Sequence, residues 1–503
     1  MQAPAHRVGN HLTVCQKADI MGAMPQGKGA SFAFVVCALA LATVATGCGS
    51  RLSTQERAEA ISALTGAGGG TGTAPTGTEG TTGTEGTTGG GGSTGAGTGS
   101  TGTGGSTGGG STGGGDSDGG TSGAASCAKA TKNTDTGATA SKLTIATLAD
   151  VSGVQPGLFQ SAHHAARAAA AYINSTGGIC GRQIDPLLLD SKTDSGGNRS
   201  AMLEACDKAF AVAGSMSAFD DGSAAPGQAC GIPDITAITT NSQKYKATNV
   251  YPAYPNAGPQ IGDTSARYIA KRFPDAIKKS AILWLNQAVT KNNAVSREKV
   301  WKTAGFKFDY RAEVQVLEAN YTRFVSEMRS RGIQYVTMVA DFQNIVRLQK
   351  TMKQQNFVPK VRDWDSVAYD ADYLQERDAV EGSFIFLNNG LFEEQSPEMK
   401  LYTEWLQKAA PGSTPDYFGL YAWSAYRLMQ QTATKVGPDL TREKFLAALK
   451  ATKEWDGHGI HGPHQIAKKL PTVCNLYVQV KGGKFTRMHP ASGFDCSGAL
   501  KAA

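Results

Sequence analysis

One strand–loop–helix–strand unit constrains the fold of this chain more than any other feature. Residues 143–148 form a short apolar run, and 184–189 form a second one. Between them, small apolar side chains recur at helical spacing over 157–174, and the pair Gly177-Gly178 then ends the helix because glycine tolerates positive φ. Units of this kind build parallel α/β sheets, since the helix returns the chain to the start of the next strand.

The same alternation of apolar runs and helical stretches continues along the chain. Further strands are expected at 210–214, 233–238, 280–285, 312–317, 334–340, 361–364 and 382–387. Helices are expected at 198–209, 260–272, 291–304, 321–331, 342–356, 396–409, 416–436 and 441–451, and a hairpin at 475–480 and 485–488. This pattern predicts an α/β fold with helices on both faces of parallel sheets, and it contains too many strands for one sheet.

The N-terminus has the features of an export signal. Lys28 precedes an apolar run over 32–44, which is as long as a signal-peptide core and too short to span a bilayer. The following residues, Val44 to Cys48, resemble a bacterial lipobox, in which small residues precede a cysteine that becomes lipidated. We therefore expect residues 1–47 to be a lipoprotein signal peptide and Cys48 to be the anchor. The alternative is an ordinary secretory cleavage site with an incidental cysteine.

A long stretch after Cys48 has almost no apolar side chains. From Gly66 to about Ser126 the sequence is nearly all glycine, threonine and serine. Such a segment buries too little apolar surface to offset the entropy of ordering, so it is predicted to be a disordered tether. Its role would be to hold a folded body away from a membrane surface.

Six cysteines remain beyond Cys48, and export to an oxidising compartment favours disulfides. Fifteen connectivities are possible in principle. We favour Cys206 with Cys230 and Cys474 with Cys496, which are near in sequence. We also favour Cys127 with Cys180, which would tie the start of the folded part to the loop after the first helix.

Composition argues against several classes of partner. The formal net charge of +7 is modest for 503 residues, and no basic cluster suited to nucleic acid occurs. His458, His461 and His464 recur at three-residue steps, but Gly459 and Pro463 argue against a helix that would align them. We expect no metal, no cofactor and no nucleic acid.

Several segments together carry a resemblance to a known family. The opening unit reads SG…G…A…IN..GG..GR.I over 152–184 and is followed by Asp190 and Asp194. Later segments are AVAGSMSA at 211–218, IPDITAITTN at 232–241 and VEGSFIF at 380–386. Over about 141–490 the chain resembles the extracytoplasmic solute-binding proteins of ABC importers, in the branch that includes leucine-isoleucine-valine binding proteins.

The resemblance implies a type I periplasmic binding protein fold. This fold has two doubly wound parallel-sheet lobes, joined by three crossing segments, that close on a ligand. The boundaries assigned here are 1–47 for the signal peptide, 48–140 for the anchor and tether, 141–262 with 390–474 for lobe 1, and 263–389 with 475–503 for lobe 2 and its hairpin.

The resemblance also implies a set of ligand-binding residues. In lobe 1, hydroxyls and backbone amides would hold the ligand carboxylate, and in lobe 2 Asp365 would bind its ammonium. Asn286 stands where relatives often have tyrosine, and Phe342 stands at an aromatic wall. The residues that would hold the carboxylate follow the third and fourth strands: Ser217, the amide of Ala218, Thr239 and Thr240, with Phe219 beside them. Ser152, Gln155 and Phe159 would line the cleft from the opening loop. Ordinary turn or packing roles remain alternatives for all of them.

The leading interpretation is a monomeric receptor, lipid-anchored outside the cytoplasm of a bacterium, that performs no chemistry. It would capture a small polar solute, such as an amino acid, possibly branched-chain, or an amide or urea-type molecule, and deliver it to an ABC permease. One alternative is an extracytoplasmic sensory ligand-binding protein without a transport role. Another is a hydrolase on a related scaffold, but the adjacent His163 and His164 would point to different helix faces.

Overall fold

The computed structural model describes residues 127–503. The predicted signal peptide (1–47), the anchor Cys48 and the tether up to Ser126 lie outside the described residues. No helix within 127–503 is long and apolar enough to cross a membrane.

The folded body begins earlier than the predicted boundary at residue 140. Cys127 is disulfide-bonded to Cys180, Ala138 is fully buried, and the amide of Thr134 donates to the carbonyl of Ala138 at 2.9 Å. The guanidinium of the buried Arg182 donates to the carbonyl of Thr139 at 2.6 Å. Side chains far along the sequence therefore hold this segment, which has no periodic apolar pattern of its own.

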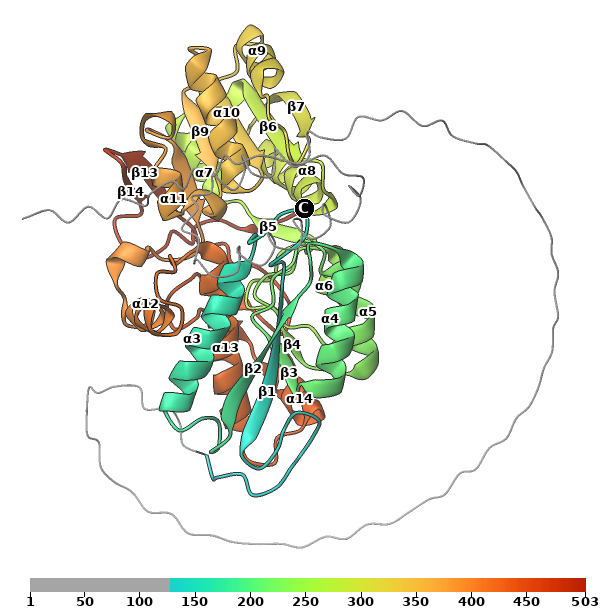
Figure 1. Ribbon diagram of the computed structural model, residues 1–503. Coiled ribbons are helices and arrows are strands. Elements are labelled where there is room, and N and C mark those ends of the chain that lie inside the picture. The colour runs from blue at the N-terminus through green and yellow to red at the C-terminus, as the bar shows by residue number, and fades with distance from the viewer. Residues whose placement is uncertain (1–126) are drawn as a thin grey trace, which may run out of the picture. The chain divides into compact units, whose positions relative to one another are not determined.

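The first lobe contains four parallel strands in the order β2-β1-β3-β4 (Figure 1). Fully buried alanines of α3, among them Ala162, Ala165 and Ala169, let this helix pack closely on the sheet. The elements are β1 (Lys142–Ala149), α3 (Gln160–Ser175), β2 (Gln183–Asp190), α4 (Ser195–Lys208), β3 (Ala211–Ala213), α5 (Asp221–Cys230), β4 (Asp234–Ile235) and α6 (Ser242–Lys246).

The helix α5 is absent from the elements expected from the sequence. It contains Pro226 inside the helix and also Gly222 and Gly227, three residues of low helix propensity. Tertiary packing overrides that propensity, because Pro226 and Gly227 are buried and the Cys206–Cys230 disulfide joins α5 to α4.

The second lobe contains seven strands in the order β14-β13-β10-β9-β8-β6-β7. The strands from β6 to β10 are parallel, and the predicted C-terminal hairpin adds β13 and β14 antiparallel. The elements are α7 (Thr264–Arg272), β6 (Ser280–Leu285), α8 (Ala288–Thr303), β7 (Phe308–Val314), α9 (Thr322–Ser330), β8 (Tyr335–Val339), α10 (Phe342–Gln354), β9 (Val361–Trp364), α11 (Ala371–Leu374), β10 (Phe384–Leu387), β13 (Leu476–Lys481) and β14 (Lys484–His489).

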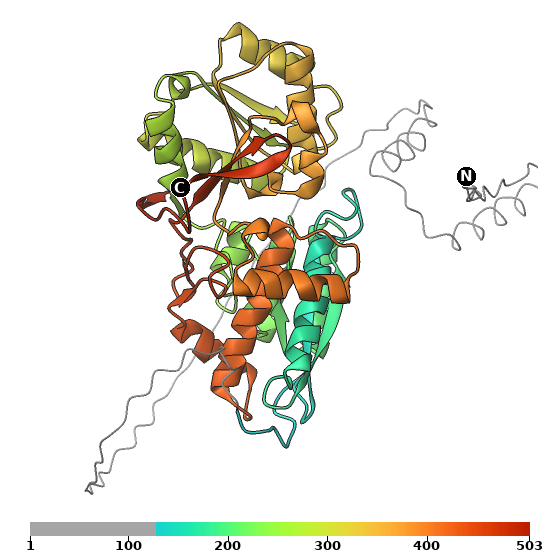
Figure 2. The same ribbon diagram turned by 90° about the vertical axis from the view of Figure 1, so that its left-hand side faces the viewer.

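The chain passes between the lobes three times, as the predicted fold requires. It enters the second lobe after β4, returns after β10, and enters the second lobe again at β13. Figure 2 shows the orange helices of the return segment beside the first lobe and the red hairpin in the second. The return segment contains α12 (Pro397–Ala409), α13 (Tyr417–Val436), α14 (Arg442–Ala451), β11 (Glu454–Trp455) and β12 (His464–Gln465), and β5 (Gln260–Gly262) pairs with β15 (Leu500–Ala502) beside the first crossing.

Packing explains why the return segment belongs to the first lobe. Leu420, Trp423 and Leu428 of α13 are fully buried in the same hydrophobic cluster as the alanines of α3. The second lobe has clusters of its own around β6, β8 and β10. The three disulfides join Cys127 with Cys180, Cys206 with Cys230, and Cys474 with Cys496, the pairings favoured from the sequence.

Candidate functional site

Both sheets have a point where successive strands are added on opposite sides. In the first sheet β2 and β3 flank β1, and in the second β7 and β8 flank β6. In open α/β sheets, ligands bind outside the carboxyl ends of the strands at such points. The residues expected to bind ligand lie in the loops after β1, β3, β4, β6, β8 and β9.

Asp150, directly after β1, binds groups in the loops that follow β2 and β3. Its side chain is fully buried, and Oδ1 accepts hydrogen bonds from the hydroxyls of Ser191 at 2.5 Å and Ser217 at 2.8 Å. Oδ2 accepts from the backbone N–H of Ala218 at 2.8 Å. Burial raises the pKa of Asp150, and these hydrogen bonds act against the rise. The carboxylate thus holds the loop after β3 against the end of β1.

Asp220 likewise fixes the backbone of the loop after β4. It is buried and accepts from the backbone N–H groups of Thr240 at 2.7 Å and Asn241 at 2.9 Å, and from the side-chain amide of Asn241 at 2.9 Å. Burial raises the pKa of Asp220 to about 6, while the Thr240 hydrogen bond and the charge of Lys244 oppose that rise.

Ser217, Ala218, Thr239 and Thr240 lie in the neighbouring loops after β3 and β4, and the hydroxyls and two amides of this set already have partners inside the protein. The Ser217 hydroxyl and the Ala218 amide bind Asp150, and the Thr240 amide binds Asp220. The hydroxyl of Thr240 donates to the carbonyl of Ser217 at 2.7 Å, and that of Thr239 to the carbonyl of Asn256 at 2.5 Å. A role for these residues in ligand binding stays a prediction.

The three candidate residues of the opening loop, Ser152, Gln155 and Phe159, differ in their burial and in the groups they contact. The hydroxyl of Ser152 donates to Asp190 at 2.5 Å, and the ring of Phe159 is buried, with its centroid 4.6 Å from that of Phe418. Gln155 is half-buried, and its Oε1 accepts from Nε2 of Gln287 in the second lobe at 3.0 Å. Gln155 is therefore the candidate that contacts both lobes.

Asp365, the expected partner of a ligand ammonium, forms an ion pair within its own lobe. Its Oδ2 lies 2.5 Å from a guanidinium nitrogen of Arg297, and the two side chains are only 20% and 10% exposed. Burial disfavours the charge of Arg297, but Asp365 more than compensates, so the pKa of the guanidinium lies above its ordinary value. The guanidinium also lies over the ring of Phe386, 5.1 Å from its centroid.

The remaining candidates are half-buried or exposed. Phe342 begins α10 and packs at the edge of a second-lobe cluster, and Phe219 packs at the edge of the first-lobe cluster. Asn286 is exposed after β6, and its backbone N–H donates to the carbonyl of Val314 at 2.7 Å. These positions leave side-chain surface available to a ligand.

Two tyrosines of the first lobe that sequence reasoning missed lie within electrostatic reach of Asp365 in the second lobe. Burial raises the pKa of Tyr254 and Tyr417, and the negative charge of Asp365 adds to the rise for both. The ring centroids of the two tyrosines are 6.4 Å apart, and Tyr417 also packs edge-on against Phe418 at 5.2 Å. We define the interlobe site as Gln155, Tyr254 and Tyr417 of the first lobe with Gln287, Arg297 and Asp365 of the second.

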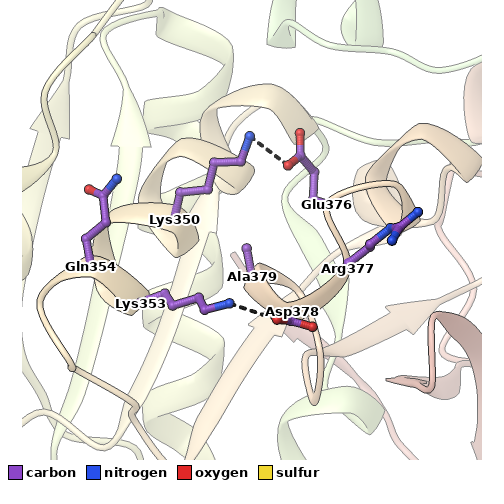
Figure 3. A pocket seen from close by; sticks show the side chains of 7 residues that line it. All are labelled: Lys350, Lys353, Gln354, Glu376, Arg377, Asp378 and Ala379. Atoms are coloured by element: carbon purple, nitrogen blue, oxygen red, sulfur yellow. Dashed lines mark hydrogen bonds and ion pairs between the residues drawn. The ribbon is translucent and has the colours of Figure 1, made fainter.

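A separate surface pocket of about 620 Å³ lies between α10 and the 3₁₀ turn Arg377–Ala379 (Figure 3). Its charges are largely paired: Lys350 lies 2.6 Å from Glu376, and Lys353 lies 3.1 Å from Asp378. None of the candidate residues lines it.

The histidines have structural surroundings. His461 is buried, contacts the Ser424 hydroxyl at 2.8 Å, and has its pKa lowered to about 4 by burial. His464 accepts from the Thr472 amide at 3.0 Å. His163 is buried and contacts the carbonyl of Thr147 at 3.1 Å. Within 127–503 no group of three histidine, cysteine or acidic residues is arranged to hold a metal ion.

Three of the solved structures with the same fold are described as substrate-binding or solute-binding proteins of transporters. A branched-chain amino acid transporter substrate-binding protein from Streptococcus pneumoniae, solved with isoleucine, is 14% identical, with a TM-score of 0.58 over 69% of this chain and 100% of that one. A fatty acid ABC transporter substrate-binding protein from Thermomonospora curvata is 16% identical, with a TM-score of 0.61 over 73% and 95%. A solute-binding protein from R. palustris, solved with 4-hydroxybenzoate, is 15% identical, with a TM-score of 0.58 over 69% and 95%.

At these identities the likeness concerns the fold. No curated protein gives a significant match to the chain. The family model described as periplasmic binding protein, however, matches residues 142–484, well over half of the sequence. This match and the two-lobed α/β architecture show that the chain belongs to the periplasmic binding protein family, with the type I fold.

Proposed function

We propose that this protein is the solute-binding receptor of an ABC importer, anchored outside the cytoplasm by a lipid on Cys48. Membership of the periplasmic binding protein family supports the solute-binding role. The lipobox-like sequence before Cys48 and the following Gly/Thr/Ser-rich stretch support a tethered receptor. Its partners are a small polar solute and the membrane permease that receives it.

The observation that carries this proposal is the meeting of the two lobes at the carboxyl ends of their sheets. Gln155 after β1 and Gln287 after β6 share a hydrogen bond of 3.0 Å, although they belong to different lobes. Asp365 after β9 lies close enough to Tyr254 and Tyr417 to influence both phenols. A solute held among these groups would contact both lobes and favour their closure.

The loops of the first lobe are rigidly supported, as a binding site requires. Asp150 and Asp220 each fix backbone amides of a neighbouring loop, so the loops are positioned before any ligand arrives. Amino acids, including branched-chain ones, and amide or urea-type molecules are the solute classes that the sequence resemblance suggests.

Transport and ligand binding test the proposal together. The purified full-length chain should bind at least one member of a panel of amino acids, amides and short ureas in isothermal titration. A strain lacking the protein should then lose uptake of that solute, and the intact gene should restore it. If binding is retained but uptake is normal without the protein, a sensory role replaces the transport role. Absence of binding across the panel would contradict a receptor for these classes.

Cellular fractionation tests the anchor. Replacing Cys48 with serine should release the protein from the membrane fraction and abolish labelling by a radioactive fatty acid. Cys37→Ser, which changes a cysteine inside the predicted signal peptide, should leave both unchanged. Membrane retention of Cys48→Ser would show that another segment holds the protein there.

A further inference from the structure

The interlobe site lacks the two free charge partners that an amino-acid zwitterion needs. We propose, on the basis of the receptor function above, that this site takes an uncharged solute with a ring, rather than a free amino acid. The inference rests on where the hydrogen bonds of the first-lobe loops and the charge of Asp365 go.

The first step concerns the ligand carboxylate. The Ser217 hydroxyl and the Ala218 amide both donate to the Asp150 carboxylate at 2.8 Å. The amides of Thr240 and Asn241 donate to Asp220 at 2.7 and 2.9 Å. A ligand carboxylate that approached these donors would have to displace a buried carboxylate and would meet its charge at short range. The protein's own acids thus occupy the place of an anionic ligand group.

The second step concerns the ligand ammonium. Asp365 is already neutralised by Arg297, with 2.5 Å between the charged atoms and little exposure of either side chain. Arg297 is held further by the hydroxyl of Thr337 at 3.2 Å and by the ring of Phe386. The Asp365–Arg297 pair carries no net negative charge, and the guanidinium would repel a ligand ammonium placed beside Asp365. The pair therefore does not provide a binding site for an ammonium.

The third step concerns what remains exposed to a ligand. Tyr254, Tyr417 and Phe418 are half-buried aromatic rings at the edge of the first-lobe cluster. Gln155 Oε1 and Gln287 Nε2 bond to each other at 3.0 Å, and the other polar atom of each side chain, Gln155 Nε2 and Gln287 Oε1, can donate to or accept from a ligand. Rings and amides favour a solute that stacks or packs a flat apolar part and hydrogen-bonds without carrying charge.

Four probes that share a benzene ring separate these charge states: benzamide is neutral, benzoate is an anion, benzylamine is a cation and L-phenylalanine is a zwitterion. The full-length protein, purified in detergent, should bind benzamide at least tenfold more tightly than the other three in isothermal titration. Tighter binding of L-phenylalanine or benzoate would overturn the inference while leaving the receptor role intact. If none of the four binds, the ring-bearing class is wrong, and the uptake assay decides separately on the receptor role.

Two variants test the causes. Asp150→Ala frees the Ser217 and Ala218 donors, so the affinity for benzoate should rise at least tenfold relative to benzamide. Arg297→Met frees Asp365, so the affinity for benzylamine should rise at least tenfold, and the double variant Arg297→Met/Asp365→Asn should lose that gain. Unchanged ratios in folded variants would contradict the inference.

Matched controls guard against effects of charge elsewhere. Asp185→Ala removes an exposed acid paired with Lys142, and Arg311→Met removes an exposed arginine paired with Glu298. Both should keep the ratios of the wild-type protein. Circular dichroism establishes folding, and where Asp150→Ala unfolds, Asp150→Asn removes the same charge with nearly the same volume.

Discussion

Asp363 lies in β9, two residues before Asp365 of the interlobe site, and its burial affects how the stability depends on pH. It is fully buried, its Oδ2 accepts from the Tyr335 hydroxyl at 2.8 Å, and its Oδ1 has no partner among residues 127–503. Burial raises the pKa of Asp363 from 3.8 to about 7. Because the folded state holds this proton more tightly than the unfolded state, Asp363 lowers the stability as pH rises from about 4 to about 7.

Asp363→Asn should flatten that part of the pH dependence. The amide stays uncharged, so the free energy of unfolding should fall less between pH 4 and pH 8 than in the wild type, by up to ~4 kcal/mol at ~1.36 kcal/mol per pKa unit. Urea unfolding across this range measures the difference. His461, whose burial lowers its pKa to about 4, acts in the opposite direction as pH falls, but it is common to both proteins. If the free energy of unfolding depends on pH in the same way in Asp363→Asn and in the wild type, Asp363 does not have the raised pKa.

A pair of glycines separates backbone strain from close contact. Gly153 and Gly177 have similar positive φ values, 98° and 94°. A Cβ at Gly153 would lie 2.0 Å from the carbonyl oxygen of Lys192, whereas a Cβ at Gly177 meets nothing within 4 Å. Gly177→Ala should cost ~1 kcal/mol of stability, and Gly153→Ala at least ~2 kcal/mol more. Equal losses in chemical denaturation would show that the opening loop yields to the added methyl group.

Among the elements, the end of α4 depends on a residue from a distant helix. The Arg442 guanidinium, at the start of α14, donates to the carbonyls of Cys206 at 2.9 Å, Ala209 at 2.6 Å and Phe210 at 3.2 Å. A cation at a helix C-terminus satisfies carbonyls that have no partner within the helix. The sequence alone could predict α4 and α14 but not that one closes the end of the other.

Replacing Arg442 tests that connection. Arg442→Ala should lower the free energy of unfolding by ~2–4 kcal/mol, since charged hydrogen bonds contribute ~1.5–3 kcal/mol each and their effects overlap. Arg442→Lys keeps the charge without the forked geometry, so its free energy of unfolding should lie between those of the wild type and Arg442→Ala. Arg323→Ala, a highly exposed arginine 3.6 Å from Glu318, should change stability by less than ~0.5 kcal/mol. A loss at Arg442 no larger than at Arg323 would refute the proposed role.

For the whole molecule, the hydrogen bond between Gln155 and Gln287 is one direct contact between the lobes, beside the packing of Val289 against the first-lobe cluster. The hydrogen bond of 3.0 Å joins residues that are 132 positions apart. Gln287→Ala should weaken that contact by ~0.5–1.5 kcal/mol and speed amide hydrogen exchange in 152–159 and 286–291 about 2- to 10-fold. Gln375→Ala, which removes only a hydrogen bond to the nearby Asp372, should leave both segments unchanged. Unaltered exchange in Gln287→Ala would mean that other contacts hold the lobes.

The sequence by itself determined the architecture, because local periodicity and loop composition specify strands, helices and their alternation. It indicated the two-lobed fold and the three disulfide pairings, but it gave no sign of α5, whose proline and glycines are compensated by packing. The sequence likewise predicts that 127–140 belongs to the tether, because the partners that order this segment, such as Cys180 and Arg182, are distant in sequence.

The tertiary structure decided where the polar groups of the site are directed. Ser217 and Asp365 were recognisable as loop residues at strand ends, yet their partners lie 67 and 68 positions away, at Asp150 and Arg297. A hydroxyl or a carboxylate can serve a ligand or a neighbouring side chain equally well, and only the folded arrangement of distant segments chooses between them. The sequence could therefore identify the loops at the strand ends, but it could not show which partners the polar groups of these loops bind.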